Sequence, residues 1–300
     1  MKITDQIEKA LKSGFPVVAL ESSVISQGLA YPKNLEIAME MENVIRSENA
    51  VPATLAIIKG EIKVGCNHDD IRLLALNKTV LKAGAREIGY AIASNKTAAL
   101  TVSASICVAN KVKVRVFATG GIGGVHPLTK SNPYDVSADL FELSRNPVIV
   151  VCSGAKSILD LKTTLELLET LSVPVFGYQT KKFPAFFTKA SELNIPEVSS
   201  PDEIALIACK HWEMSNSAIL LCLPVQEEFE IPSDEIESGL KIAQQEAFEN
   251  NITGQMITPF LLKRLSEITQ GRTLIANEKL LLGNGKLAAK VATSLIKIQL

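Results

Sequence analysis

The sequence predicts a three-layer α/β/α sandwich with a largely parallel central sheet, because short apolar runs alternate with amphipathic helical segments. The run at 53–65 is expected to form a hairpin that turns at Lys59-Gly60. No repeat, low-complexity segment or linker interrupts the alternation, so we expect a single domain over residues 1–300. The predicted strands lie at 16–20, 53–65, 114–121, 148–154, 173–178 and 218–224.

Helices are predicted between these runs and after the last of them. The first is indicated by apolar residues at helical spacing, ends at Gly14, and has Ile3, Ile7, Ala10 and Leu11 on its apolar face. Another begins at Tyr31-Pro32, with proline near its first turn. The part after residue 230 is mostly helical, and we expect it to pack onto the domain. The remaining helices are expected at about 98–110, 137–145, 157–170, 201–211, 233–250, 259–269 and 277–298.

Composition excludes several classes of protein. A net charge of −1 provides no general attraction to nucleic acid or to an anionic membrane, so we expect neither as a partner. The start of the chain does not read as a signal peptide, and no apolar stretch approaches the roughly 18 residues of a membrane span. Five widely spaced cysteines without a C-x-x-C pair indicate free thiols in a reducing compartment. We therefore expect a cytoplasmic protein.

Polar residues follow three predicted strands at the point where each strand ends. Glu21 comes directly after "VVAL", the glycine-rich loop "ATGGIGGVH" follows "VRVF", and Lys156 follows "VIVV". Asp135 opens the helix that returns from the glycine-rich loop. Because ligands of open parallel sheets bind at the carboxyl ends of the strands, these groups are predicted to share one crevice.

Each group also has an ordinary structural explanation. Lys156 can hold an anion at a helix start, carry its charge out to water on a long stem, or lose its proton and attack a carbonyl if poorly solvated. Glu21 can cap the next segment, and Asp135 can cap a helix or hold Mg²⁺ or Mn²⁺ with waters. The glycine-rich loop matches neither a dinucleotide nor a nucleoside-triphosphate motif, but its four glycines allow close approach or positive φ.

Taken together, the sequence resembles the pseudouridine-5′-phosphate glycosidase family, also called indigoidine synthase A-like. The resemblance covers nearly the whole chain in family order. It is carried by "ALESSVISQGLAYPKN", "VPATLAIIKGEIKVG", "FATGGIGGVH", "DVSADL", "CSGAKSILD", "ETLSVPVFGY", "FPAFFT", "ITPFLL" and "ANEKLLLGNGKLAAKVA".

The resemblance implies an enzyme of the carbon–oxygen lyase class that reversibly cleaves the C–C glycosidic bond of pseudouridine 5′-phosphate to uracil and ribose 5-phosphate. It implies Lys156 as the nucleophile, Glu21 as the proton donor, and Asp135 as the site of one divalent cation per subunit, Mn²⁺ or alternatively Mg²⁺. It also implies a homotrimer. Substrate contacts are implied for Lys82, Val102, Ser137, Ala138 and Asp139, and His126 and Asn284 match positions that line the same pocket.

The chain departs from the family pattern in three places. "PLT" stands after "GGVH" where the family has Arg-Gly-Ala, Gly283-Asn284 replaces paired asparagines, and "KAGARE" beginning at Lys82 replaces a more basic "KASRRD". Two alternatives therefore stand beside the implied reaction: another Schiff-base lyase or aldolase acting on a sugar phosphate, and a catalytically inactive sugar-phosphate-binding protein. For the lysine mechanism, Lys156 must be neutral part of the time, which burial and nearby Lys82 would favour.

Overall fold

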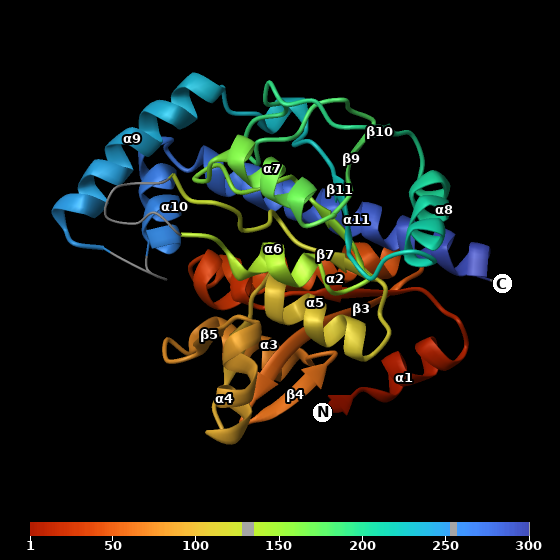
Figure 1. The fold of residues 1–300 in the computed structure, drawn as a ribbon. Helices are drawn as coiled ribbons and strands as arrows, with labels where there is room; N and C mark the ends of the chain where they lie inside the picture. The colour runs from red at the N-terminus through yellow and green to blue at the C-terminus, as the bar shows by residue number, and fades with distance from the viewer. Residues whose placement is uncertain (128–134, 253–256, 300) are drawn as a thin grey trace.

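The computed structural model describes residues 1–127, 135–252 and 257–299 (Figure 1), so Leu128 and Thr129 of the altered "PLT" stretch lie outside the described residues. Within this part of the chain, eleven strands form one sheet in the order β1-β4-β3-β2-β7-β8-β11-β9-β10, with β6 paired to β3 and β5 paired to β6. The strands are β1 Lys2–Ile3, β2 Val17–Leu20, β3 Val51–Ile58, β4 Glu61–Val64, β5 Leu81–Ala83, β6 Ala98–Leu100, β7 Val116–Ala118, β8 Ile149–Cys152, β9 Val175–Tyr178, β10 Glu197–Val198 and β11 Ile219–Cys222.

The pairing of the strands is parallel except where β3 meets β4 and β6. All six predicted runs contain strands, and the hairpin at Lys59-Gly60 is confirmed, with φ of 47° and 74° at its two turn residues. In the middle of the sheet, Leu20 pairs with Ala118 and Ala118 with Val151. The carboxyl ends of β2, β7 and β8 therefore lie side by side.

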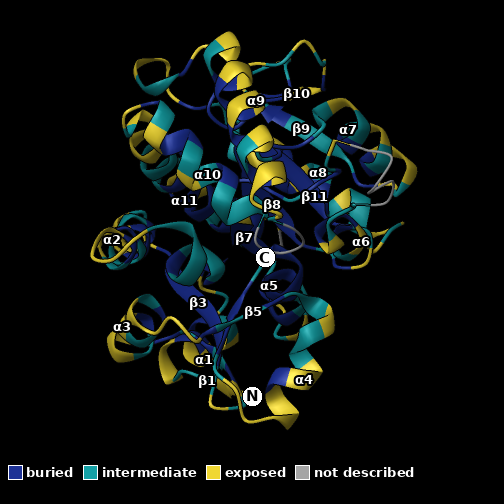
Figure 2. Ribbon diagram, turned by 90° about the vertical axis from the view of Figure 1, so that its left-hand side faces the viewer, coloured by how far each residue is buried: buried dark blue, intermediate teal, exposed yellow. Residues whose placement is uncertain are grey.

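Helices cover both faces of this sheet. In Figure 2, α2, α10 and α11 lie on one side of the strands and α5, α6 and α7 on the other, which confirms the three-layer sandwich. The helices are α1 Asp5–Lys12, α2 Lys33–Ser47, α3 His68–Leu76, α4 Ile88–Ala93, α5 Val102–Lys111, α6 Ala138–Leu143, α7 Leu161–Thr170, α8 Pro201–Trp212, α9 Ser233–Glu249, α10 Ile257–Ile268 and α11 Arg272–Gln299.

Several sequence predictions were wrong in detail, and the helix expected from residue 277 begins at Arg272. The helix expected from residue 98 begins at Val102, because Ala98–Leu100 forms β6, fully buried between β3 and β5. The helix expected from residue 157 begins at Leu161, where the Asp160 carboxylate accepts the amide of Thr163 at 2.9 Å. Ile3 belongs to β1, which pairs with β4, and not to the first helix. Lys156 therefore precedes the nearest helix by several residues.

The helical C-terminal part packs across the sheet as expected. Helix α11, 28 residues long, crosses the molecule in Figure 1 and contacts α2, α8, β2, β7 and β8. Despite this length, none of the helices within the described residues combines the length and apolar composition that a membrane span requires.

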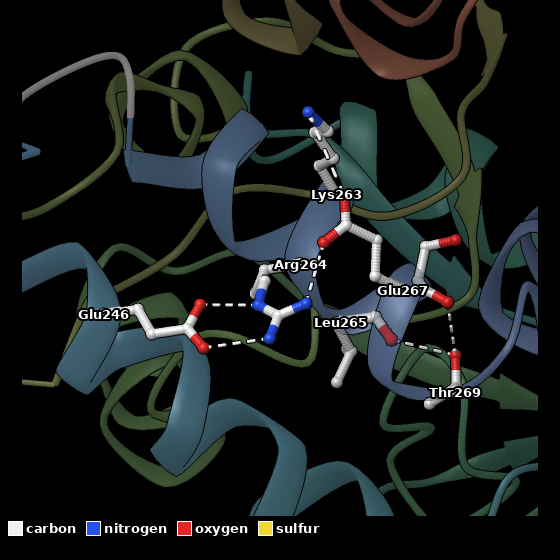
Figure 3. Close-up of polar contacts among 7 residues, drawn as sticks. Glu246, Lys263, Arg264, Leu265, Glu267 and Thr269 are labelled. Carbon is white, nitrogen blue, oxygen red and sulfur yellow. Dashed lines mark hydrogen bonds and ion pairs between the residues drawn. The ribbon is translucent and has the colours of Figure 1, made fainter. Parts of the chain in front are cut away.

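Helices α9 and α10 form a hairpin fastened by Arg264. Its guanidinium reaches both carboxylate oxygens of Glu246, at 2.5 and 3.0 Å, and Glu267 at 2.8 Å (Figure 3). These hydrogen-bonded carboxylates raise the pKa of Arg264 above its ordinary value, so the guanidinium stays charged. Helix α10, which carries Arg264, supplies Thr258, Pro259 and Leu262 to the wall of a large cavity.

The turn after β8 depends on glycine at position 154. Gly154 has a φ of +79°, and a Cβ at this position would lie 2.1 Å from the carbonyl oxygen of Pro184, a backbone atom that cannot rotate away. We expect Gly154→Ala to lower the free energy of unfolding by about 3 kcal/mol, measured by urea denaturation.

Gly89 provides the matched control for this substitution. It lies in α4, and a Cβ at this position would have nothing within 4 Å, so Gly89→Ala should raise stability by about 0.5–1 kcal/mol. Equal stability of Gly154→Ala and the wild type would contradict the strain inferred at this turn.

Candidate active site

A cavity of about 460 Å³ opens at the carboxyl ends of β2, β7 and β8. Its volume lies within the range of small-molecule sites. Glu21, Asp135 and Lys156 line it, as the convergence of strand ends predicted. Six further residues that the family resemblance implied also line it: Lys82, Val102, His126, Ser137, Ala138 and Asp139. Asn284, which the resemblance also implied, is fully buried and is not among the described residues that line the cavity.

Glu21 is a buried carboxylate held by two hydroxyl groups. It directly follows β2, and only 8% of its surface is exposed. The hydroxyl of Ser23 donates to Oε2, and the hydroxyl of Thr119, at the end of β7, donates to Oε1. Both oxygens thus have partners, and the carboxyl group is fixed at the cavity wall.

Two lysines share the cavity with this carboxylate. Lys156 lies in the turn after β8, where its backbone amide donates to Ile122 at 3.1 Å, and Lys82 lies in β5. Burial lowers the pKa of Lys82, the nearby charge of Lys156 lowers it further, and Glu21 and Asp139 oppose the shift. The charge of Lys156 thus acts against the ammonium form of Lys82.

Asp139 joins the glycine-rich loop to the start of α5. One carboxylate oxygen accepts the backbone amide of Ser103 and the other that of Gly123, both at 2.8 Å. Ser137, the N-cap of α6, accepts the amide of Asp139 at 3.2 Å. This arrangement orders the wall in which Val102, Ser137 and Ala138 lie.

The glycine-rich loop uses its glycines for close approach. None of its four glycines has a positive φ. A Cβ at Gly121 would lie 2.7 Å from the ring of Phe186, at Gly123 it would lie 2.3 Å from Ser137 Oγ, and at Gly124 2.4 Å from Thr164 Oγ1. The loop can therefore pack against these neighbours only without side chains, and its backbone borders the cavity directly.

Asp135 and His126 lie next to each other at the edge of the glycine-rich loop. The backbone amide of His126 donates to the carbonyl oxygen of Asp135 at 2.9 Å. Burial lowers the pKa of His126, the charges of Lys156 and Lys82 lower it further, and Asp135 opposes the shift. The neutral imidazole is thus favoured.

The donor set around Asp135 fits a hydrated divalent cation. Within the described residues, no three His, Cys, Asp or Glu side chains are grouped as metal ligands. Mg²⁺ and Mn²⁺ accept one carboxylate together with waters and phosphate oxygens, so a single carboxylate at the cavity wall is compatible with such an ion.

Several cavity residues were missed in the sequence analysis. Ser23 lies inside the quoted "LESS", Thr119 begins the glycine-rich loop, and Arg86 belongs to "KAGARE", but no spacing rule marked them. Asn277 of α11 and Phe186 come from segments far from the strand ends in sequence. Only the packing of α11 and of the loop after β9 against the sheet brings them to the cavity.

We expect Lys82→Met to raise the thermal midpoint at pH 7, because it removes a partly buried ammonium group near the charge of Lys156. The pKa of Lys82 in the folded state lies below its ordinary value. At pH values between these two pKa values, the unfolded state binds more protons than the folded state, so the stability of the wild type rises with pH. The advantage of the variant should therefore shrink toward the ordinary lysine pKa, which calorimetry between about pH 7 and pH 10 can measure.

Lys162→Met, at an exposed position of α7, is the control and should show no such pH-dependent difference. A constant difference between Lys82→Met and the wild type over this range would contradict the lowered pKa.

Comparison with known proteins gives one consistent result. The family model described as indigoidine synthase A like protein matches residues 6–294. The pseudouridine-5′-phosphate glycosidase of Mycoplasmopsis agalactiae is 46% identical over 97% of both chains, and that of Kosmotoga olearia is 48% identical over 93% of this chain and 96% of its own.

Solved structures agree with these sequence relatives. The prealnumycin C-glycosynthase AlnA, in complex with ribulose 5-phosphate, superposes with a TM-score of 0.92 at 34% identity, over 99% of this chain and 97% of its own. An indigoidine synthase A-like protein from Thermotoga maritima gives 0.88 at 39% identity, over 94% of both chains. The chain with this lysine- and carboxylate-lined cavity therefore belongs to the indigoidine synthase A-like family.

Proposed function

We propose that this chain is a pseudouridine-5′-phosphate glycosidase, which cleaves the C–C bond between ribose 5-phosphate and uracil and also catalyses the reverse reaction. The observation that carries the proposal is the presence of Lys156 and the doubly hydrogen-bonded Glu21 in one cavity. Relatives of this name align over nearly the whole chain. The C-glycosynthase neighbour, with its bound ribulose 5-phosphate, supports a sugar phosphate as the substrate class.

A nucleophilic lysine suits a substrate whose leaving atom is carbon. Ordinary glycosidases protonate an oxygen or nitrogen leaving group between paired carboxylates, and that route is closed when the sugar is attached to C5 of uracil. In the proposed first step, the neutral amine of Lys156 attacks C1′, the bond from C1′ to the ring oxygen breaks, and protonated Glu21 donates its proton to that oxygen.

The second step breaks the glycosidic bond. The secondary ammonium formed on Lys156 first passes a proton to the Glu21 carboxylate, and Glu21 then protonates C5 of uracil, with the C5–C6 double bond supplying the electron pair. The nitrogen lone pair of Lys156 forms an iminium with C1′ as the C1′–C5 electron pair restores the C5–C6 double bond and releases uracil. Water then adds to the iminium and releases ribose 5-phosphate and the free amine.

Charged groups around the cavity suit the phosphorylated sugar. Lys82 supplies positive charge, and the backbone of the glycine-rich loop is accessible at the cavity wall. Asp135 is the residue that would hold a divalent cation, Mn²⁺ by the family resemblance, and such an ion would neutralise phosphate charge. We infer a cytoplasmic enzyme, since all five cysteines are free thiols.

The first test is turnover of pseudouridine 5′-phosphate, followed by the change in ultraviolet absorbance as uracil forms. Lys156→Arg should lower turnover at least about 1,000-fold, because a guanidinium stays protonated and cannot attack C1′. Borohydride added with ribose 5-phosphate should leave a covalent adduct on Lys156 of the wild type, identified by mass spectrometry.

Lys82→Arg is the matched control, because it keeps the positive charge of a residue that is not the nucleophile and should reduce turnover far less. Rapid cleavage by Lys156→Arg, with no wild-type adduct, would exclude the mechanism. Release of an aldehyde from plain sugar phosphates would favour a lyase or aldolase, and ligand-induced stabilisation without turnover would favour a binding protein.

Activity should require a divalent cation, and Asp135→Ala should abolish turnover or weaken its dependence on Mn²⁺. The reason is that Asp135 is a carboxylate in the cavity wall, next to His126, whose lowered pKa favours the neutral imidazole. Turnover is to be measured in Mn²⁺, in Mg²⁺ and in excess chelator. Full wild-type activity in chelator would refute the requirement.

We also propose that the chain assembles as a homotrimer, as the resemblance to the glycosidase family implies. Light scattering at micromolar concentration should give three times the chain mass of 32.4 kDa. A monomer mass under these conditions would rule the assembly out.

A further inference from the structure

Asn284 joins two loops that carry the proposed catalytic residues. Its side chain projects from the middle of α11 and is fully buried. The amide nitrogen lies 2.8 Å from the carbonyl oxygen of Thr119 and 3.3 Å from that of Gly120, both after β7, and 3.2 Å from Oγ of Ser153, after β8. One side chain thus reaches both strand ends from the helix layer.

The loop after β7 positions Glu21. The hydroxyl of Thr119 donates to the Glu21 carboxylate, while the backbone carbonyl of the same residue accepts from Asn284. A shift of the Thr119 backbone would therefore move one of the two hydroxyl groups that orient Glu21.

The loop after β8 positions Lys156. Ser153 precedes Lys156 by three residues, and its amide donates to Gly120 at 2.8 Å. Further along, the amide of Ile122 donates to Gly154 at 3.0 Å and that of Lys156 to Ile122 at 3.1 Å. Backbone hydrogen bonds between the two loops thus continue the pairing of β7 with β8 beyond the strand ends. Asn284 contacts the first residues of both loops, next to the sheet.

Glycines flank Asn284 and allow α11 to lie close to its neighbours. A Cβ at Gly285 would lie 3.3 Å from Sδ of Met41, and one at Gly283 3.4 Å from Leu223. The short Asn284 side chain can therefore span from the helix to the strand ends.

We propose that Asn284 is a positioning residue that fixes the Glu21 carboxylate relative to the Lys156 amine and does not touch the substrate. The inference rests on the proposed roles of Glu21 and Lys156. In that reaction, proton donation and nucleophilic attack act on the two atoms of one bond. A misplacement of about 1 Å in such a pair can lower a rate by about 100-fold.

Asn284→Ala should lower kcat for pseudouridine 5′-phosphate by about 100-fold while KM stays within about threefold, because the cavity wall keeps its own side chains. Borohydride trapping of ribose 5-phosphate on Lys156 should slow in parallel. Ser153→Ala, which keeps the bonds from Asn284 to Thr119 and Gly120, should lower kcat by only about tenfold. The combined variant should lose less than the product of the two effects, since both changes disrupt one connection.

Asn146→Ala is the matched control. Asn146 is also a buried asparagine whose amide donates to a backbone carbonyl, that of Glu142 at 2.8 Å, but it precedes β8 at the opposite edge of the sheet. This variant should keep kcat within about twofold even if its thermal midpoint falls.

The outcomes separate the two proposals. A wild type without turnover overturns the proposed function. An active wild type with unchanged kcat in Asn284→Ala, or with a raised KM alone, overturns the positioning role. If Asn284→Ala does not fold, unchanged kcat in Ser153→Ala overturns it, and a loss of kcat at constant KM supports it.

Discussion

Parallel pairing of β2, β7 and β8 is the constraint on which the site depends. Parallel strands end at the same edge of a sheet, and the registers of Leu20 with Ala118 and of Ala118 with Val151 align these three ends. The residues that directly follow the three strands therefore lie side by side along one edge of the sheet. Glu21 and Thr119 can touch, and the turn that carries Lys156 lies one strand further along.

The polar groups at this edge are held before any ligand arrives. Glu21 accepts two hydroxyl groups, and Asp139 accepts two backbone amides. Such bonds are stronger inside a protein than in water, and they replace the rotamer freedom that the side chains would otherwise keep. Lys82 differs, because burial and the nearby charge of Lys156 act against its ammonium form. The two carboxylates are thus fixed in position by hydrogen bonds, whereas the surroundings of Lys82 lower its pKa.

Regular apolar patterns in the sequence were sufficient to predict many of the strands and helices. The apolar run at 148–154 contains β8, and the periodic segment at 233–250 is α9 almost to the residue. Short elements were not predictable in the same way. Ala98–Leu100 is a strand because β3 and β5 lie beside it, and three small apolar residues carry no period of their own.

The sequence by itself determined which apolar runs contain β2, β7 and β8, and that Glu21, the glycine-rich loop and Lys156 lie at their carboxyl ends, because a local apolar pattern marks where a strand lies. The tertiary structure alone decided what Asn284 does, since its partners Thr119 and Ser153 lie 165 and 131 residues away. It also decided that Asp139 joins two segments, and that the loop glycines serve close packing and not positive φ. These contacts arise where helices meet the sheet, and no local pattern records which residues will face each other there.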